Sequence, residues 1–219
     1  MLSHLDRILF PDRCEVIEVI PSQRYVYPIF KNGWTSLQHA VVQNNWKIKL
    51  NNQITAINNI DVIIREPHSR TISGLNTYVQ HTLRDNPGLD PDTILWFATN
   101  YLYLNRHYCP QFLWLINLTK YLSLDAKLNF LGMELIQHFT TAHLIPPGIK
   151  LPTQEFIKKI EDLSCHDMYQ RIDIAIFNCI GQSLTFSELL QHIKITDPAA
   201  YEYVIEHAQQ ILKPTYALS

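Results

Sequence analysis

The feature that most restricts the fold of this chain is a short apolar run followed closely by a helix pattern. Residues 60–65 read Ile-Asp-Val-Ile-Ile-Arg, and most of them are β-branched and apolar. Such a run is typical of a strand that is buried on both faces, as in a parallel sheet. A helix pattern follows over about 69–84 and is closed by the turn residues of 85–88. A strand that leads into a helix in this way favours an α/β fold.

An earlier segment repeats the same order. Residues 24–30 alternate aromatic and β-branched side chains, which predicts a strand that ends near Pro28, since proline is awkward in mid-strand. A turn at 31–34 then leads into a helix predicted over 35–44, with one apolar face and with Thr35 or Ser36 as its cap. Two such units in succession predict a sheet with parallel strands.

The rest of the chain has a mainly helical pattern. Pro91 opens a helix that is predicted to run to about 103. Further short strands of the same sheet are candidates at 112–116 and 129–132, and the helices predicted beyond Pro152 cover 153–163, 166–180, 185–193 and 198–212. We therefore predict a single domain over 1–219, with a mostly helical C-terminal half.

Composition and charge limit the function classes. Of the 219 residues, 47% are hydrophobic and 17% are charged, an ordinary globular balance. The formal net charge of -2 provides no basic field, which argues against a nucleic-acid partner but permits a local anion site. The four cysteines form no C-x-x-C pair and the histidines lack ligand spacing, so no metal site is expected.

The N-terminal residues 1–20 lack the basic segment, apolar run and cleavage site of a secretory signal. No run reaches the roughly 18 uncharged apolar residues that are needed to span a bilayer. We therefore expect a cytoplasmic protein without a membrane span.

The first strand-to-helix junction is suited to binding an anion. A helix start exposes unpaired N–H groups and a partial positive charge, and Gly33 allows the backbone to approach a ligand closely. Lys31 precedes the loop's only glycine, unlike the lysine of a Walker A loop, so this loop does not support an ATPase or kinase. The predicted phosphate or sulfate cradle consists of Lys31, Asn32, Gly33, Trp34, Thr35 and Ser36.

The second junction provides another anion clamp. Arg65 ends the buried strand, and Ser73 follows eight positions later within the predicted helix. A guanidinium can bind two oxygens of a phosphate, and a serine hydroxyl can donate to a third. Two clamps on neighbouring strands suit a ligand with two separated phosphate groups.

Two motifs carry a family resemblance. Residues 27–37 resemble the 5′-phosphosulfate loop of sulfotransferases that use 3′-phosphoadenosine 5′-phosphosulfate (PAPS), except that Trp34 stands where that family usually has a small residue. Residues 64–74 resemble the family's 3′-phosphate motif, and the order and separation of the two motifs fit its compact bacterial members. Residues 107–111 resemble the His-x-x-Pro-Gln segment of the carbohydrate sulfotransferase branch.

The resemblance implies a fold and an activity. The fold would be a P-loop-like parallel sheet flanked by helices, and the reaction a metal-free, in-line transfer of a sulfuryl group from PAPS to a hydroxyl or amine acceptor, such as a glycan or other small molecule. The product nucleotide would be 3′,5′-ADP. Lys31 would stabilise the bridging oxygen, the cradle would hold the 5′-phosphate, and Arg65 and Ser73 would hold the 3′-phosphate.

The acceptor also needs a general base, and several residues are candidates. His107 is the first, because imidazole titrates near neutrality and the residue lies in the family-like segment. Glu66, His68 and Glu134 are alternatives. Two other functions stay open: a non-catalytic 3′-phosphoadenosine nucleotide-binding protein in which Trp34 blocks the acceptor side, and a small-molecule kinase.

Overall fold

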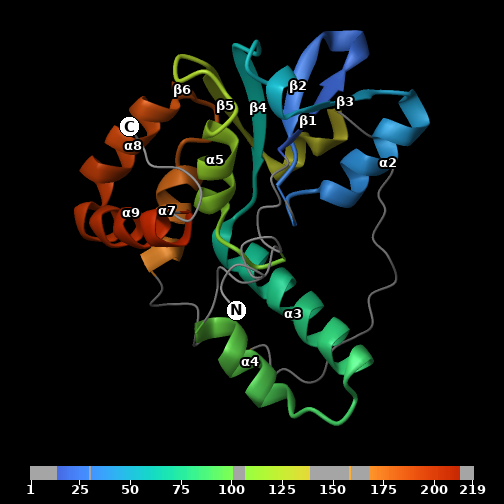
Figure 1. Cartoon of the computed structure of the whole chain (residues 1–219), viewed down its shortest axis with the longest axis vertical. Coiled ribbons are helices and arrows are strands. Elements are labelled where there is room, and N and C mark those ends of the chain that lie inside the picture. Colours follow the sequence, from blue (N-terminus) through green and yellow to red (C-terminus); the bar gives the residue numbers. More distant parts are fainter. Residues whose placement is uncertain (1–13, 30, 101–106, 139–157, 159–167, 213–219) are drawn as a thin grey trace.

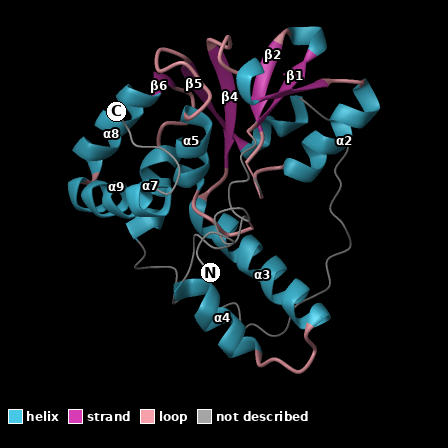
Figure 2. Ribbon diagram, viewed as in Figure 1, coloured by secondary structure: helices cyan, strands magenta, loops and turns pink. Residues whose placement is uncertain are grey.

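The structure is a computed structural model with a mixed β-sheet at its centre (Figures 1 and 2). Within the described residues the sheet has six strands in the order β3-β1-β2-β4-β5-β6. The predicted α/β class is confirmed, although the sheet is parallel only in its central part. The structure describes residues 14–29, 31–100, 107–138, 158 and 168–212.

The centre of the sheet consists of three parallel strands: β2 (Arg24–Tyr27), β4 (Asn59–Ile64) and β5 (Lys127–Gly132). They match the strands predicted at 24–30, 60–65 and 129–132. β2 ends before Pro28, because proline has no N–H for the next ladder bond. Parallel strands bring their carboxyl ends to one edge of the sheet, so the residues that follow these three strands gather there.

Antiparallel strands form both sides of the sheet, and here the prediction of a parallel sheet is wrong. β1 (Glu15–Val19) pairs with β2 and with β3 (Lys47–Leu50), and β6 (Ser183–Thr185) pairs with β5. All three are short, with three to five residues each, and the sequence analysis predicted no strand at these positions.

Helices cover the two faces of the sheet. α2 (Trp34–Asn44), which matches the helix predicted over 35–44, packs on one face. The other face is covered by four helices that share its main apolar cluster (Figure 1). These are α5 (Gln111–Thr119), α7 (Met168–Phe177), α8 (Phe186–Thr196) and α9 (Pro198–Leu212).

α5 corrects the strand expected at 112–116. Its seven buried residues lie all around the helix, and a helix buried in this way is apolar on every side. A short apolar run cannot be assigned to strand or helix by periodicity alone, and this run is a helix.

The C-terminal helices agree with the sequence pattern. α7, α8 and α9 correspond to the predictions over 166–180, 185–193 and 198–212. The helix predicted over 153–163 lies outside the described residues apart from position 158. Within the described ranges, none of the helices combines the length and apolar character that a membrane crossing needs.

α3 (Pro67–Asp85) and α4 (Pro91–Asn100) extend beyond the carboxyl edge of the sheet (Figure 1). Together with Tyr108 they form a separate apolar cluster. α3 matches the helix predicted over 69–84 and begins two residues earlier, because proline is favoured at the first helical position. α4 matches the start at Pro91, and the residues predicted to extend it, 101–103, lie outside the described ranges.

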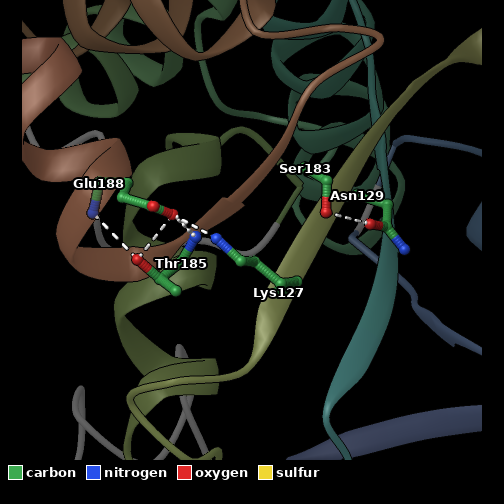
Figure 3. A network of polar contacts seen from close by, with 5 residues as sticks. All are labelled: Lys127, Asn129, Ser183, Thr185 and Glu188. Carbon is green, nitrogen blue, oxygen red and sulfur yellow. Dashed lines mark hydrogen bonds and ion pairs between the residues drawn. The ribbon is translucent and has the colours of Figure 1, made fainter.

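The opposite edge of the sheet is tied together by a polar network. Asp61, buried in β4, accepts hydrogen bonds from Arg24 Nε at 2.6 Å and from Asn129 Nδ2 at 3.0 Å. Ser183 Oγ of β6 donates to Asn129 Oδ1 at 2.7 Å (Figure 3). The network therefore links β2, β4, β5 and β6 away from the carboxyl edge.

Beside it, Glu188 fastens the start of α8 to the sheet. Its Oε2 accepts from Lys127 Nζ at 2.7 Å and from the Thr185 backbone N–H at 2.7 Å (Figure 3). Glu188 N donates in return to Thr185 Oγ1 at 3.2 Å, which completes a capping box. The Lys127 hydrogen bond and the Thr185 contacts lower the pKa of Glu188 to about 2.

Candidate functional site

Lys31 and Arg65 lie side by side at the carboxyl edge of the sheet. Lys31 follows β2 and Arg65 follows β4, and these two strands are parallel neighbours. Arg65 Nη1 donates a hydrogen bond to the backbone oxygen of Lys31 at 3.2 Å. The structure therefore brings together the two positive residues that the sequence placed in separate motifs.

The loop after β2 opens towards α2 without a side-chain cap. Lys31 and Gly33 both have positive φ, at 67° and 82°, and Gly33 is the N-cap residue of α2. Because glycine has no side chain that could accept a hydrogen bond, Gly33 provides no side-chain cap to the first turn of α2. Uncapped amides at a helix start can hold an anion.

A glycine is required at position 33 by the nearby side chain of Ile136 as well as by the positive φ. The segment η4 (Met133–His138) follows β5 and packs against the loop, so that a Cβ on Gly33 would lie 1.7 Å from Cδ1 of Ile136. No other residue fits there without moving Ile136. η4 therefore belongs to the walls of the candidate site.

The side chain of Asn32 holds the loop in place. It is fully buried, and its Nδ2 donates to Ile63 O at 2.8 Å and to Gln111 Oε1 at 2.5 Å. Its backbone N–H donates to Ile29 O at 3.0 Å. Since these donors are used within the protein, the side chain of Asn32 positions the loop, and its assignment as a cofactor-binding residue stays a prediction.

Gln111, at the start of α5, joins both junctions. Besides accepting from Asn32, its Oε1 accepts from Arg65 N at 3.1 Å, and its Nε2 donates to Arg65 O at 3.0 Å. The backbone N–H of Gln111 donates to the carboxylate of Asp173 at 2.8 Å. The sequence placed Gln111 in the family-like segment but assigned it no role.

α3 presents a row of hydroxyl groups to the two cations. Ser69, Ser73 and Thr77 are spaced by four residues and therefore lie on one face of the helix. Arg65 Nε approaches Ser69 Oγ at 3.4 Å, and Lys31 Nζ donates to Thr77 Oγ1. Ser73 lies between these two contacts, where the sequence predicted a phosphate-binding hydroxyl.

Positive charge accumulates around this row. Burial lowers the pKa of Lys31, and the nearby charges of Arg65 and Arg70 lower it further. Burial also lowers the pKa of Arg65, against the opposing effect of Glu66. Arg70 lies in the same sequence motif but was not predicted as a site residue. Its position three residues before Ser73 on a predicted helix is the signal that could have identified it.

Glu66 has a structural role at the start of α3. Its carboxylate accepts from the backbone N–H groups of His68 at 2.9 Å and Ser69 at 2.7 Å, as an N-cap does. Burial acts to raise the pKa of Glu66, but these hydrogen bonds outweigh it and lower the pKa. A general base works best with a pKa near the operating pH, so the geometry disfavours Glu66 in that role.

The other base candidates lie on different elements. His107 sits in the turn before α5, where its ring meets that of His81 edge-on at 5.5 Å. α3 approaches it so closely that a Cβ on Gly74 would lie 2.2 Å from His107 O. Glu134 follows β5 at the carboxyl edge and is exposed, two residues before Ile136. His68, half-buried, lies in the first turn of α3.

Comparisons with protein-family models, with curated proteins and with solved structures found no match to this chain. Three cations, an uncapped helix start and a row of hydroxyls meet at the edge of an α/β sheet where such folds bind ligands. This arrangement is suited to an anion.

Proposed function

We propose that this chain is a PAPS-dependent sulfotransferase that transfers a sulfuryl group to a hydroxyl or amine acceptor, with a carbohydrate as the acceptor class. The contact between Arg65 Nη1 and Lys31 O carries the proposal. It means that a single nucleotide with two phosphate groups can reach both motifs at once. Had the two cations lain on different edges of the sheet, no single nucleotide could have bridged them.

The site residues fit the two ends of such a nucleotide. Thr35, Ser36 and the amides of their loop would hold the 5′-phosphate, with Lys31 at the bridging oxygen, and Arg65 with Ser73 would hold the 3′-phosphate. The second clamp would distinguish PAPS from ATP, which has no 3′-phosphate. The buried positive charge of the site supports a ligand with more than one negative group.

PAPS, when bound, supplies an activated sulfuryl group attached to its 5′-phosphate. The part that we assign to Lys31 is to stabilise the negative charge that develops on the bridging oxygen. Its hydrogen bond to Thr77 restrains a long, flexible side chain next to α3. The lowered pKa of Lys31 makes its ammonium a stronger proton donor to that oxygen.

The acceptor's proton would go to a base at the open side of the site. We assign this role to His107, with Glu134 as the alternative that shares the carboxyl edge with Lys31. Glu66 is the weakest candidate, because its carboxylate already caps α3.

Calorimetry tests the nucleotide specificity. We expect 3′,5′-ADP to bind at least about tenfold more tightly than 5′-ADP or ATP, without magnesium, because only the first carries the 3′-phosphate. Equal binding of ATP would contradict the proposal and support a small-molecule kinase.

Transfer of labelled sulfate from PAPS to a panel of glycans tests catalysis. Labelled products are expected with the intact chain. Tight binding of 3′,5′-ADP without transfer to any hydroxyl or amine acceptor would leave the non-catalytic nucleotide-binding protein as the better function.

A further inference from the structure

Arg70 is a buried cation whose hydrogen-bonding groups are incompletely used. It lies in the second turn of α3 and is 1% exposed. Within the described part of the chain, its Nε and Nη2 have no hydrogen-bond partner. A buried charge with unused hydrogen-bond donors destabilises the folded protein, so a bound anion that accepts from these donors would be strongly favoured.

The acidic neighbour of Arg70, Asp173, already accepts hydrogen bonds from the backbone. Asp173, in α7, exerts a favourable charge effect on Arg70, second in size to the effect of burial. However, the two carboxylate oxygens of Asp173 accept from the backbone N–H groups of Gln111 and Phe112, at 2.8 Å and 2.9 Å. Asp173 therefore anchors the start of α5, and Arg70 Nε and Nη2 stay without a bonded acceptor.

Apart from Asp173, the charged side chains of the described residues that interact with Arg70 are positive. Arg70 acts electrostatically on Lys31, and Arg65 acts on Arg70. Counted over the described residues alone, these three cations and the buried carboxylate of Asp173 leave an excess of two positive charges, while Glu66, next to Arg65, is exposed to water and screened. A phosphate monoester carries about -1.5 to -2 at neutral pH and matches this excess, whereas a phosphate diester carries a single charge.

We propose that Arg70 binds the same anion as Arg65 and Ser73, from the buried side of α3, and that it selects a phosphate monoester. Arg70 and Ser73 are three residues apart on α3, so one ligand can contact both. The inference rests on the proposed function only in naming that anion as the 3′-phosphate of the nucleotide.

The test compares two properties of the free and bound protein. Arg70→Met removes the charge but keeps an unbranched side chain. It is expected to weaken the binding of 3′,5′-ADP about tenfold to hundredfold, as for a lost hydrogen bond between charged groups. The affinity for 5′-AMP should stay unchanged. The melting temperature of the ligand-free variant should equal or exceed that of the wild type, because an uncompensated buried charge has been removed.

Arg84→Met is the matched control, since Arg84 is an exposed arginine on the same helix. It should change neither the affinity for 3′,5′-ADP nor the affinity for 5′-AMP. A purely structural role for Arg70, as a support for Asp173, predicts the reverse pattern: the ligand-free Arg70→Met protein melts lower and binds 3′,5′-ADP like the wild type. That result would overturn the inference.

Arg70→Lys decides the question if Arg70→Met does not fold. It keeps the positive charge but loses the planar guanidinium that can donate two hydrogen bonds at once. A partial loss of affinity for 3′,5′-ADP supports the inference, and an unchanged affinity refutes it.

Inorganic phosphate separates the inference from the proposed function. If the wild type binds 3′,5′-ADP no better than 5′-AMP, but loses phosphate affinity about tenfold on Arg70→Met, the sulfotransferase proposal fails and the role of Arg70 stands. If the wild type binds neither 3′,5′-ADP nor phosphate, both are refuted.

Discussion

Gln111 and Arg65 exchange two hydrogen bonds, from the Arg65 backbone N–H to Gln111 Oε1 and from Gln111 Nε2 to the Arg65 backbone oxygen. The side chain of Gln111 thus pairs with a backbone unit as a neighbouring strand would. Since the same Oε1 also accepts from Asn32, one buried amide sets the relative position of the two loops that carry Lys31 and Arg65.

Gln111→Met should therefore damage both stability and binding. Methionine has a similar length but leaves the Arg65 backbone groups without partners, which should lower the free energy of unfolding by about 2–3 kcal/mol in a urea titration. Affinity for 3′,5′-ADP should fall with it. Gln182→Met, at an exposed position, is the control and should change neither quantity. Wild-type stability in Gln111→Met would contradict the positioning role.

Gly33→Ala tests the close contact with Ile136. Gly33 and Gly181 both have positive φ, but a Cβ on Gly181 meets open space. Gly181→Ala should thus cost only the backbone strain of about 1–2 kcal/mol, and Gly33→Ala should cost more, because Ile136 must move. Adding Ile136→Ala to Gly33→Ala should recover part of the affinity for 3′,5′-ADP. Equal stability losses in the two glycine variants would show that Ile136 moves aside at no cost.

Lys31→Ala should separate binding from turnover. If Lys31 stabilises the bridging oxygen, sulfate transfer should drop at least about 100-fold, as for the loss of one transition-state donor. Affinity for 3′,5′-ADP, measured by calorimetry, should change only a few-fold, since that product carries no sulfuryl group. Lys47→Ala, an exposed lysine of β3, should keep full activity. Transfer that survives Lys31→Ala would rule out this role.

The pH dependence of sulfate transfer distinguishes the candidate bases. His107→Asn should abolish the acidic limb of the kcat/KM profile if His107 accepts the acceptor's proton, because an unprotonated imidazole is then required. Glu134→Gln should in that case keep the limb. The opposite pattern would assign the base to Glu134.

Glu188 makes the docking of α8 sensitive to acid. Its pKa falls from an ordinary 4.5 to about 2 in the folded chain, so its contribution is fully present above about pH 4.5 and is lost as the pH falls towards 2. Wild type should thus be more stable than Glu188→Gln at neutral pH in denaturant titrations, and the two should converge near pH 2. A difference that is independent of pH would contradict a charge-based contribution. Thr185→Ala removes the reciprocal cap and should cost about 1 kcal/mol at neutral pH.

The two strand-to-helix junctions were predictable because each combines several local signals. A β-branched buried run before Arg65 and a proline near the end of β2 marked the strands, and the periodic apolar faces of α2 and α3 marked the helices. Strands that are each followed by a helix tend to run parallel, so Lys31 and Arg65 could be expected at the same edge of the sheet.

The remaining features depend on tertiary packing. α5 is buried all around, so its sequence lacks the helical periodicity of an amphipathic helix. β1 and β3 are short strands with several polar residues, and they are held in the sheet by pairing with each other and, for β1, with β2. The role of Gln111 arises only when α5 lies beside both loops, and the unsatisfied state of Arg70 depends on Asp173 being held by α5. No local pattern in the sequence contains these relations.

The tie between Arg24, Asp61 and Asn129 has a consequence for the far end of the sheet. Val26 pairs with Asp61 and Tyr27 with Val62. This register determines the relative positions of Lys31, which follows β2, and Arg65, which follows β4. A slip of one residue would shift Lys31 by about 3.3 Å relative to Arg65 and would exchange the inward and outward faces of the strand. The spacing between Lys31 and Arg65 therefore depends on side chains at the other ends of these strands.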